Sequence, residues 1–183
     1  QGPVMYTQDR VTKNNRTFKI YKFRTMFVGA EDETGPVLSS GKNDPRVTKA
    51  GIILRKLRLD ELPQLLNVLK GDMSIVGPRP ERPCFVEEFC ESIPEYSHRY
   101  VVKAGVTGYA QVLGYYNTSP EDKLRYDLIY IKNYSLLLDI KLILQTIKVV
   151  FTGNMINDKI VAQNFMKSNK HYKLQNKEHV VRL

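Results

Sequence analysis

The chain has 183 residues, with 28 lysines and arginines against 19 aspartates and glutamates, so its formal net charge is +9. This length fits one domain with its own core; no apolar run approaches the roughly 20 residues that span a bilayer, and the two cysteines support neither a zinc site nor a disulfide framework. The basic residues are concentrated in residues 1–60 and 121–183, which suits nucleic acid, an anionic membrane surface or a phosphorylated substrate, and equally a basic surface that serves only solubility.

The first predicted element is an antiparallel β-hairpin. Residues 4–11 and 17–26 are rich in β-prone side chains, and the Asn-Asn pair between them can occupy left-handed turn positions. Side chains alternate between the two faces of a strand, so Lys22 and Arg24 share one face and are expected to project together. Such a pair suits a phosphate, although solvated charges on a half-exposed strand are the commoner arrangement.

Two adjacent carboxylates, Asp60 and Glu61, lie between arginines near the centre of the chain. Asp60 has the properties of a helix N-cap, and a short amphipathic helix over about residues 52–57 precedes it. At a helix start, the helix dipole together with Arg55 and Arg58 would hold the Asp60 carboxylate ionised, as a nucleophile or a metal ligand requires. Because aspartate is a favoured cap, a capping role alone would also explain this residue.

A helix is predicted after the two carboxylates, over about residues 61–70. It places apolar side chains at helical spacing, and we assign them to the core: Leu62, Leu65, Leu66 and Leu69. Gly71 is expected to end the helix.

A rigid segment follows this helix. Prolines on both sides of Arg79 fix its neighbours' φ angles, and Gly77 permits a close backbone approach. A guanidinium held this stiffly suits bidentate phosphate binding. The alternative is that Arg79 forms a structural ion pair with Glu61 or Asp72.

The rest of the chain is predicted to be mainly helical. Residues 81–101 form a helix with a break at Pro94, and the glycines of residues 103–111 indicate a tight turn. Ser119 is expected to cap a helix that continues to about Tyr134.

The last predicted helix covers the strongly apolar residues 136–151. It either packs on the core or lies in a membrane interface with its lysines toward lipid phosphates. We therefore expect an α+β fold in which an N-terminal antiparallel hairpin packs on several amphipathic helices. Residues 1–151 would form the main domain, and residues 152–183 a basic C-terminal extension of it.

Three motifs carry a resemblance to a known family. They are Lys22-Phe23-Arg24-Thr25-Met26, the block from Leu54 to Pro83, and Gly105-Val106-Thr107-Gly108-Tyr109-Ala110-Gln111. Together they resemble the bacterial sugar transferase family, the monotopic polyprenyl-phosphate phosphoglycosyl transferases, from about Gly2 to Phe151. The resemblance implies a membrane-associated catalytic domain at the cytoplasmic face of the bacterial inner (cytoplasmic) membrane, with a hydrophobic anchor expected before residue 1.

The resemblance also implies an activity. A phosphosugar would pass from a UDP-sugar to polyprenyl (undecaprenyl) phosphate, with release of UMP, to initiate exopolysaccharide, capsule or glycoconjugate assembly. Asp60 would attack the β-phosphorus to give an aspartyl-phosphosugar intermediate, and Glu61 would bind Mg²⁺ or assist the acceptor. Which of these two carboxylates holds the metal stays open. Substrate contacts are expected from Lys22, Arg24, Arg55, Arg79, Thr107 and Gln111.

Other interpretations and details remain open. A basic nucleic-acid-binding module is one alternative, although neither a helix-turn-helix signature nor an RNA-binding strand pattern is present. A catalytically silent scaffold of the same fold, acting at the membrane, is another. Relatives often have Asn-Gly-Arg where this chain has Leu113-Gly114-Tyr115-Tyr116-Asn117, so the accepted sugar stays open. The acceptor chain length and the formation of homo-oligomers are also undecided.

Overall fold

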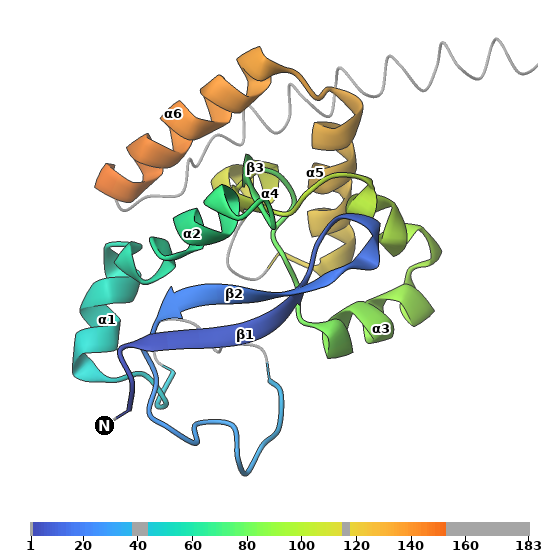
Figure 1. Cartoon of the computed structure of the whole chain (residues 1–183). Coiled ribbons are helices and arrows are strands. Elements are labelled where there is room, and N and C mark those ends of the chain that lie inside the picture. The colour runs from blue at the N-terminus through green and yellow to red at the C-terminus, as the bar shows by residue number, and fades with distance from the viewer. Residues whose placement is uncertain (1, 38–43, 115–117, 153–183) are drawn as a thin grey trace, which may run out of the picture.

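A computed structural model describes residues 2–37, 44–114 and 118–152 (Figure 1). Strands β1 (Met5–Val11) and β2 (Thr17–Phe23) form an antiparallel hairpin, joined through the single-turn helix η1 (Lys13–Asn15). Asn14 and Asn15 have φ angles of 58° and 57°. The predicted hairpin and its left-handed turn residues are therefore confirmed.

The other elements surround this hairpin and a second, smaller sheet. In chain order they are α1 (Lys49–Lys56), η2 (Leu59–Glu61), α2 (Gln64–Leu69), β3 (Ser74–Val76), α3 (Pro83–Ser92), η3 (Pro94–Val101), β4 (Gly105–Thr107), α4 (Tyr109–Leu113), α5 (Pro120–Lys132) and α6 (Leu136–Thr152). The mixed content confirms the α+β class. The predicted break at Pro94 and the Ser119 cap, whose Oγ accepts from the Asp122 amide, are also present.

Most of the predicted C-terminal extension, residues 153–183, lies outside the described residues, as do the three residues from Tyr115 to Asn117. Within the described part of the chain, no helix is both long enough and apolar enough to cross a membrane.

The second sheet, a parallel pair, was not expected from the sequence. Strand β3 pairs with β4, and the amide of Gly77 donates to the Thr107 carbonyl at 2.8 Å. A Cβ atom on Gly77 would lie 2.4 Å from the Lys103 carbonyl oxygen. The expected close backbone approach at Gly77 is therefore confirmed, and it carries the chain directly from β3 into the segment that holds Arg79.

Three clusters of buried side chains form the core. The first joins β3, α4, α5 and α6 through Val76, Tyr109, Val112, Leu113, Tyr130 and Leu142; the second contains Val11, Tyr96, Tyr100 and Leu124; the third contains Phe18, Ile20 and Met73. Helix α6 contributes to the first cluster on one side only. Leu142 is fully buried, whereas Leu136 and Leu137 are 75% and 80% exposed.

The leucines that we assigned to the core of the central helix are not buried, so that prediction is wrong. Leu62, Leu65 and Leu66 are about half exposed, and Leu69 is 84% exposed. They belong to an apolar surface along α1, η2 and α2, which we call the leucine face; it consists of Ile52, Ile53, Leu57, Leu59, Leu62, Leu65, Leu66 and Leu69. Figure 1 shows α1 and α2 on the left-hand side of the molecule, with α6 above α2.

The polar side of α2 faces inward because strand β2 has an open edge. Asn67, which is completely buried, accepts from the Tyr21 amide at 3.0 Å and donates to the Lys19 carbonyl at 2.8 Å. One side-chain amide thus satisfies two backbone groups that burial would otherwise leave unpaired. Gln64 is buried on the same side of α2, so the leucines of this helix are turned outward.

Candidate active site

The site is built around Glu61, at the end of η2. Arg58 adopts the left-handed conformation, with φ 57°, and this residue separates α1 from η2. Glu61 then reaches two cations: Lys22 Nζ lies 3.3 Å from Oε1, and Arg79 places Nη2 2.5 Å from Oε1 and Nη1 3.3 Å from Oε2. Burial alone would raise the pKa of Glu61, but Arg79 and Lys22 hold it well below its usual value of 4.5. Of the two roles considered for Arg79, the ion pair with Glu61 is thus present, whereas Asp72 pairs with Arg16 instead.

Asp60 has a different environment from its neighbour. It lies inside η2, and Pro63 occupies the cap position of α2, so the predicted capping role is wrong. The side chain of Asp60 makes no hydrogen bond or ion pair with another described residue. Burial and the negative charge of Glu61 raise its pKa, while Lys22, Arg55 and Arg79 oppose the rise. The helix dipole and the arginines were expected to favour the ionised form of Asp60, but the net shift is upward, because η2 is a single turn with little dipole and the charge of Glu61 lies alongside.

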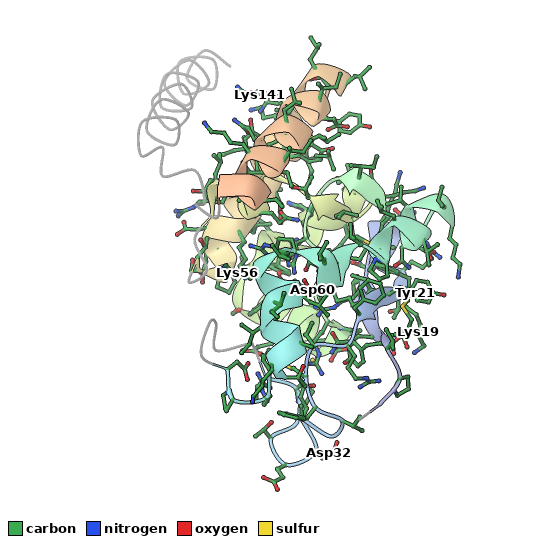
Figure 2. The ribbon with its side chains drawn as sticks, turned by 90° about the vertical axis from the view of Figure 1, so that its left-hand side faces the viewer. Lys19, Tyr21, Asp32, Lys56, Asp60 and Lys141 are labelled. Carbon is green, nitrogen blue, oxygen red and sulfur yellow. The ribbon has the colours of Figure 1, made fainter. Side chains whose placement is uncertain are left out.

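The predicted cations are only partly brought together. Lys22, on the inward face of β2, and Arg79 meet at Glu61; burial lowers the pKa of Lys22 to about 8, although Glu61 opposes this. Arg55 on α1 interacts electrostatically with Asp60, and its Nε donates to Thr25 Oγ1 at 2.9 Å. Arg24, beyond the end of β2, instead donates to the Pro3 carbonyl and lies over the Tyr6 ring. Figure 2 shows Asp60 on the side of the molecule that carries α1.

The two polar residues expected near the donor sugar lie on β4 and α4. The Thr107 hydroxyl is 2.6 Å from that of Thr146 on α6, so it joins β4 to that helix. Gln111 has a buried side-chain amide whose nitrogen and oxygen have no hydrogen-bond partner among the described residues. The described structure gives neither residue a contact with Asp60 or Glu61, and their role in substrate binding remains a prediction.

Arg10 is a site residue that the sequence reasoning missed. In the hairpin register it lies opposite Phe18, on the same face as Lys22. Its Nη1 donates to the Pro80 carbonyl at 3.3 Å and lies 3.8 Å from Glu81. With Lys22 and Arg79 it lines a small cavity of about 10 Å³, enough for one water molecule. Strand alternation in residues 5–11, which places every second side chain inward, was the signal that could have found it.

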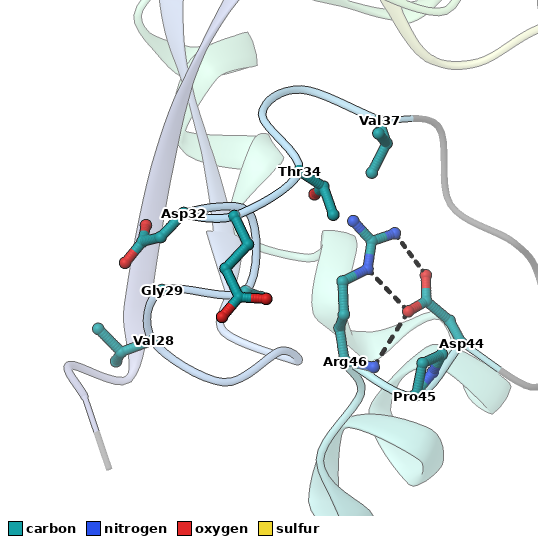
Figure 3. Close-up of a pocket in the computed structure, with 10 residues that line it drawn as sticks. Val28, Gly29, Asp32, Thr34, Val37, Asp44, Pro45 and Arg46 are labelled. Carbon is teal, nitrogen blue, oxygen red and sulfur yellow. Dashed lines mark hydrogen bonds and ion pairs between the residues drawn. The ribbon is translucent and has the colours of Figure 1, made fainter.

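A larger cavity, of about 600 Å³, lies elsewhere (Figure 3). It is an open cavity lined by residues from the segments 28–37 and 44–46, and Arg46 on its wall is paired with Asp44 through two contacts of 2.8 and 2.7 Å. Its lining shares no residue with the cluster around Glu61, and it carries Asp32 and Glu33. This acidic lining is unsuited to a diphosphate, so we place the chemistry at the smaller site.

Asp60 and Glu61 differ in their ability to bind a magnesium ion. Within the described residues there is no group of three or more histidine, cysteine or carboxylate side chains that could hold a metal ion. Mg²⁺, however, is often held by one or two carboxylates together with substrate phosphates. Glu61 already neutralises two cations, whereas Asp60 has no such partner. The donor set therefore fits a metal that is shared between Asp60 and a diphosphate.

Comparison with known proteins decides the family. The family model described as bacterial sugar transferase matches residues 1–153. The chain belongs to this family. The resemblance noted from its three motifs is thereby confirmed.

Curated members of the bacterial sugar transferase family are similar over most of this chain. An Aeromonas hydrophila protein named UDP-N-acetylgalactosamine-undecaprenyl-phosphate N-acetylgalactosaminephosphotransferase is 48% identical over 155 residues, covering 83% of this chain and 36% of that protein. A Bacillus subtilis protein, named a putative undecaprenyl-phosphate N-acetylgalactosaminyl 1-phosphate transferase, is 50% identical, covering 69% and 60% respectively. An Escherichia coli UDP-glucose:undecaprenyl-phosphate glucose-1-phosphate transferase is 42% identical, covering 80% and 32%. The chain thus spans between about a third and three fifths of the length of these relatives.

Proposed function

We propose that this chain is the catalytic domain of an enzyme that transfers a phosphosugar from a UDP-sugar to a polyprenyl phosphate such as undecaprenyl phosphate. The enzyme would act at the cytoplasmic face of the bacterial inner membrane and initiate the assembly of a surface polysaccharide or glycoconjugate. Family membership and the names of the relatives support this activity. The observation that carries it is the pair Asp60 and Glu61: Glu61 is ion-paired with Lys22 and Arg79, and Asp60 lies beside the same cations without an ion pair of its own.

In the first step, a carboxylate oxygen of Asp60 attacks the β-phosphorus of the UDP-sugar. A phosphorus–oxygen bond forms to Asp60, the bond to the bridging oxygen of the diphosphate breaks, and UMP leaves with the electron pair. In the second step, an oxygen of the polyprenyl phosphate attacks the same phosphorus and releases the Asp60 carboxylate. The raised pKa of Asp60 makes it a more basic nucleophile than an ordinary aspartate.

The remaining residues orient and stabilise charge. Glu61 holds Lys22 and Arg79 in fixed positions, so that their remaining N–H groups can be directed at phosphoryl oxygens. Arg55 adds positive charge beside Asp60. Mg²⁺, held by Asp60 and the diphosphate, would neutralise charge that develops on the departing phosphate.

Release of UMP tests this function. The protein is incubated in detergent with Mg²⁺, undecaprenyl phosphate and, in separate reactions, UDP-N-acetylgalactosamine, UDP-glucose or UDP-galactose. We expect continuous UMP release with at least one donor, and about one UMP per protein molecule when the acceptor is omitted. A nucleic-acid-binding module would instead give a salt-dependent gel shift without UMP, and a silent scaffold would give neither.

We also propose that the leucine face lies against an anionic bilayer. All eight of its apolar side chains are exposed, among them Leu69 at 84%, and a concentration of exposed apolar residues is typical of a membrane or protein interaction site. Lysines and arginines accompany it, namely Lys49, Lys56, Arg58 and Lys70, as in helices that lie in a membrane interface. Figure 2 looks onto this side of the molecule and shows Lys56 beside Asp60, and Lys141 of α6 above them. A lipid phosphate held at this surface would therefore approach the side of the molecule that carries Asp60.

Vesicle sedimentation tests the membrane proposal. Replacing Leu66 and Leu69 together with glutamine should weaken binding to vesicles of phosphatidylcholine and phosphatidylglycerol by about 10-fold or more, because two exposed leucines lose their apolar contact with lipid. The matched control is Val101→Gln, which changes a half-exposed residue of η3 outside the leucine face. Equal loss of binding in the control and the double variant would contradict a role for this face.

A further inference from the structure

Arg79 is held at its backbone as well as at its guanidinium. Its carbonyl accepts a hydrogen bond from Arg99 Nη2 at 2.8 Å, and the next carbonyl, of Pro80, accepts from Arg10. Because prolines flank Arg79 and lack an N–H, this segment has few means of pairing as a strand or helix. Two arginine side chains from distant parts of the chain replace those missing backbone contacts.

The donor to Arg79 is itself part of a buried ion pair. Arg99 on η3 and Asp127 on α5 are 1% and 2% exposed, and Arg99 Nη2 lies 2.7 Å from Asp127 Oδ2. Arg99 Nη1 donates to the Tyr96 hydroxyl, and the guanidinium lies over the rings of Tyr96 and Tyr100. Burial raises the pKa of Asp127 to about 6, so the pair is charged at neutral pH.

Stability alone does not explain why this ion pair is buried. Burying two charges costs desolvation free energy, and apolar residues of the same volume often stabilise a fold equally well. One contact of this pair cannot be replaced by packing, namely the hydrogen bond to the Arg79 carbonyl. That bond links η3 and α5 to the residue whose guanidinium lies 2.5 Å from Glu61.

We infer that Arg99, anchored by Asp127, is a positioning residue for Arg79. It fixes the peptide between the two prolines and so limits where the Arg79 guanidinium can move relative to Glu61 and the donor phosphates. This inference rests on the proposed transferase function. Arg99 and Asp127 thus contribute to transition-state stabilisation without touching the substrate.

An apolar replacement separates positioning from stability. The variant combines Tyr96→Phe, Arg99→Met and Asp127→Leu, so that neither charge of the pair and no Tyr96 hydroxyl is left buried without a partner. Its reference is Tyr96→Phe alone, which loses the hydroxyl contact but keeps the Arg99 contacts with Asp127 and with the Arg79 carbonyl, and which should retain wild-type kcat/KM. We expect the triple variant to remain folded with a similar melting temperature while kcat/KM for UMP release falls about 10- to 100-fold, mainly through kcat.

A double-mutant cycle with Arg79→Ala completes the test. If Arg99 acts through the Arg79 side chain, the apolar replacement should change kcat/KM by no more than about twofold in the Arg79→Ala background. An equal fall in both backgrounds, or no fall in either, would overturn the inference. If the wild-type protein releases no UMP, the proposed function fails. The Tyr96→Phe reference and the triple variant, each with and without Arg79→Ala, are then compared by urea unfolding. The replacement should then shift the unfolding midpoint less in the Arg79→Ala background, and equal shifts would overturn the inference.

Discussion

Replacing Asp60 with asparagine is expected to lower UMP release by about 10⁴-fold or more, because an amide cannot form the covalent intermediate. Mass spectrometry after incubation with the UDP-sugar should show wild-type protein heavier by one phosphosugar, and no added mass in Asp60→Asn. The larger part of the loss should be in kcat, since the covalent step is abolished while Lys22 and Arg79 remain to bind the donor.

The fold of the Asp60→Asn variant should be retained. Burial and Glu61 disfavour the ionised form of Asp60, so removing its charge should leave the free energy of unfolding unchanged or slightly higher. Asp72→Asn is a matched control, because that carboxylate pairs with Arg16 on the surface rather than with the site cations. Turnover and labelling at wild-type levels in Asp60→Asn would remove Asp60 as the nucleophile.

The second large effect is expected for Glu61→Gln, which should lower both stability and activity. The Glu61 side chain is 13% exposed, and its loss of charge leaves Lys22 and Arg79 without their common partner. Removing one member of a buried pair is strongly destabilising. Because Arg79 is 36% exposed and can be partly hydrated, we expect a loss of about 2 kcal/mol. The rate should fall about 100-fold, since both cations lose their fixed positions.

Glu61→Gln should also change the pH dependence of stability. The pKa of Glu61 in the folded protein lies below its usual value of 4.5, so its stabilising contribution is present above that value and is lost as the pH falls through the folded pKa. Urea unfolding at about pH 7 and about pH 3.5 should therefore show a smaller difference for Glu61→Gln than for wild-type protein. Asp60→Asn serves as the comparison. The pKa of Asp60 is raised in the folded protein, so this carboxyl group does not favour the fold at neutral pH over acid pH, and its removal should not reduce the acid sensitivity of the protein. Identical pH dependence of Glu61→Gln and wild type would contradict the assignment of this ion pair.

These two variants exchange neighbouring carboxyl groups for amides, yet we expect a loss of stability in Glu61→Gln alone. The difference follows from their contacts rather than from their residue types. Glu61 is ion-paired with Lys22 and Arg79, which belong to other elements. The ionised form of Asp60, in contrast, is disfavoured by partial burial and by the negative charge of Glu61. Different roles were expected for the two neighbours, because the family resemblance implied that Asp60 is the nucleophile and that Glu61 binds Mg²⁺ or assists the acceptor. Which residue is paired could not be read from the sequence.

The central helix shows where sequence reasoning failed. Leucines at helical spacing ordinarily indicate a buried face, and that rule assigned four of them to the core. Asn67 turns the polar side of this helix inward, since its side-chain amide pairs with the edge of β2, which lies 46 to 48 residues earlier in the chain. Two buried backbone groups would lose their hydrogen bonds if α2 rotated to bury its leucines. Under the proposed function, the exposed leucines can instead contact the lipid bilayer.

The sequence by itself determined the features that depend on neighbouring residues. The hairpin, its left-handed asparagines, the Ser119 cap and the rigid segment around Arg79 follow from local sterics and hydrogen bonds. The order and length of the three motifs were sufficient for the family. Only the tertiary structure decided which face of α2 is buried, that Glu61 rather than Asp60 takes the cations, and that Arg99 and Asp127 reach the Arg79 peptide. Those outcomes depend on buried polar groups of separate elements finding partners, which no local pattern specifies.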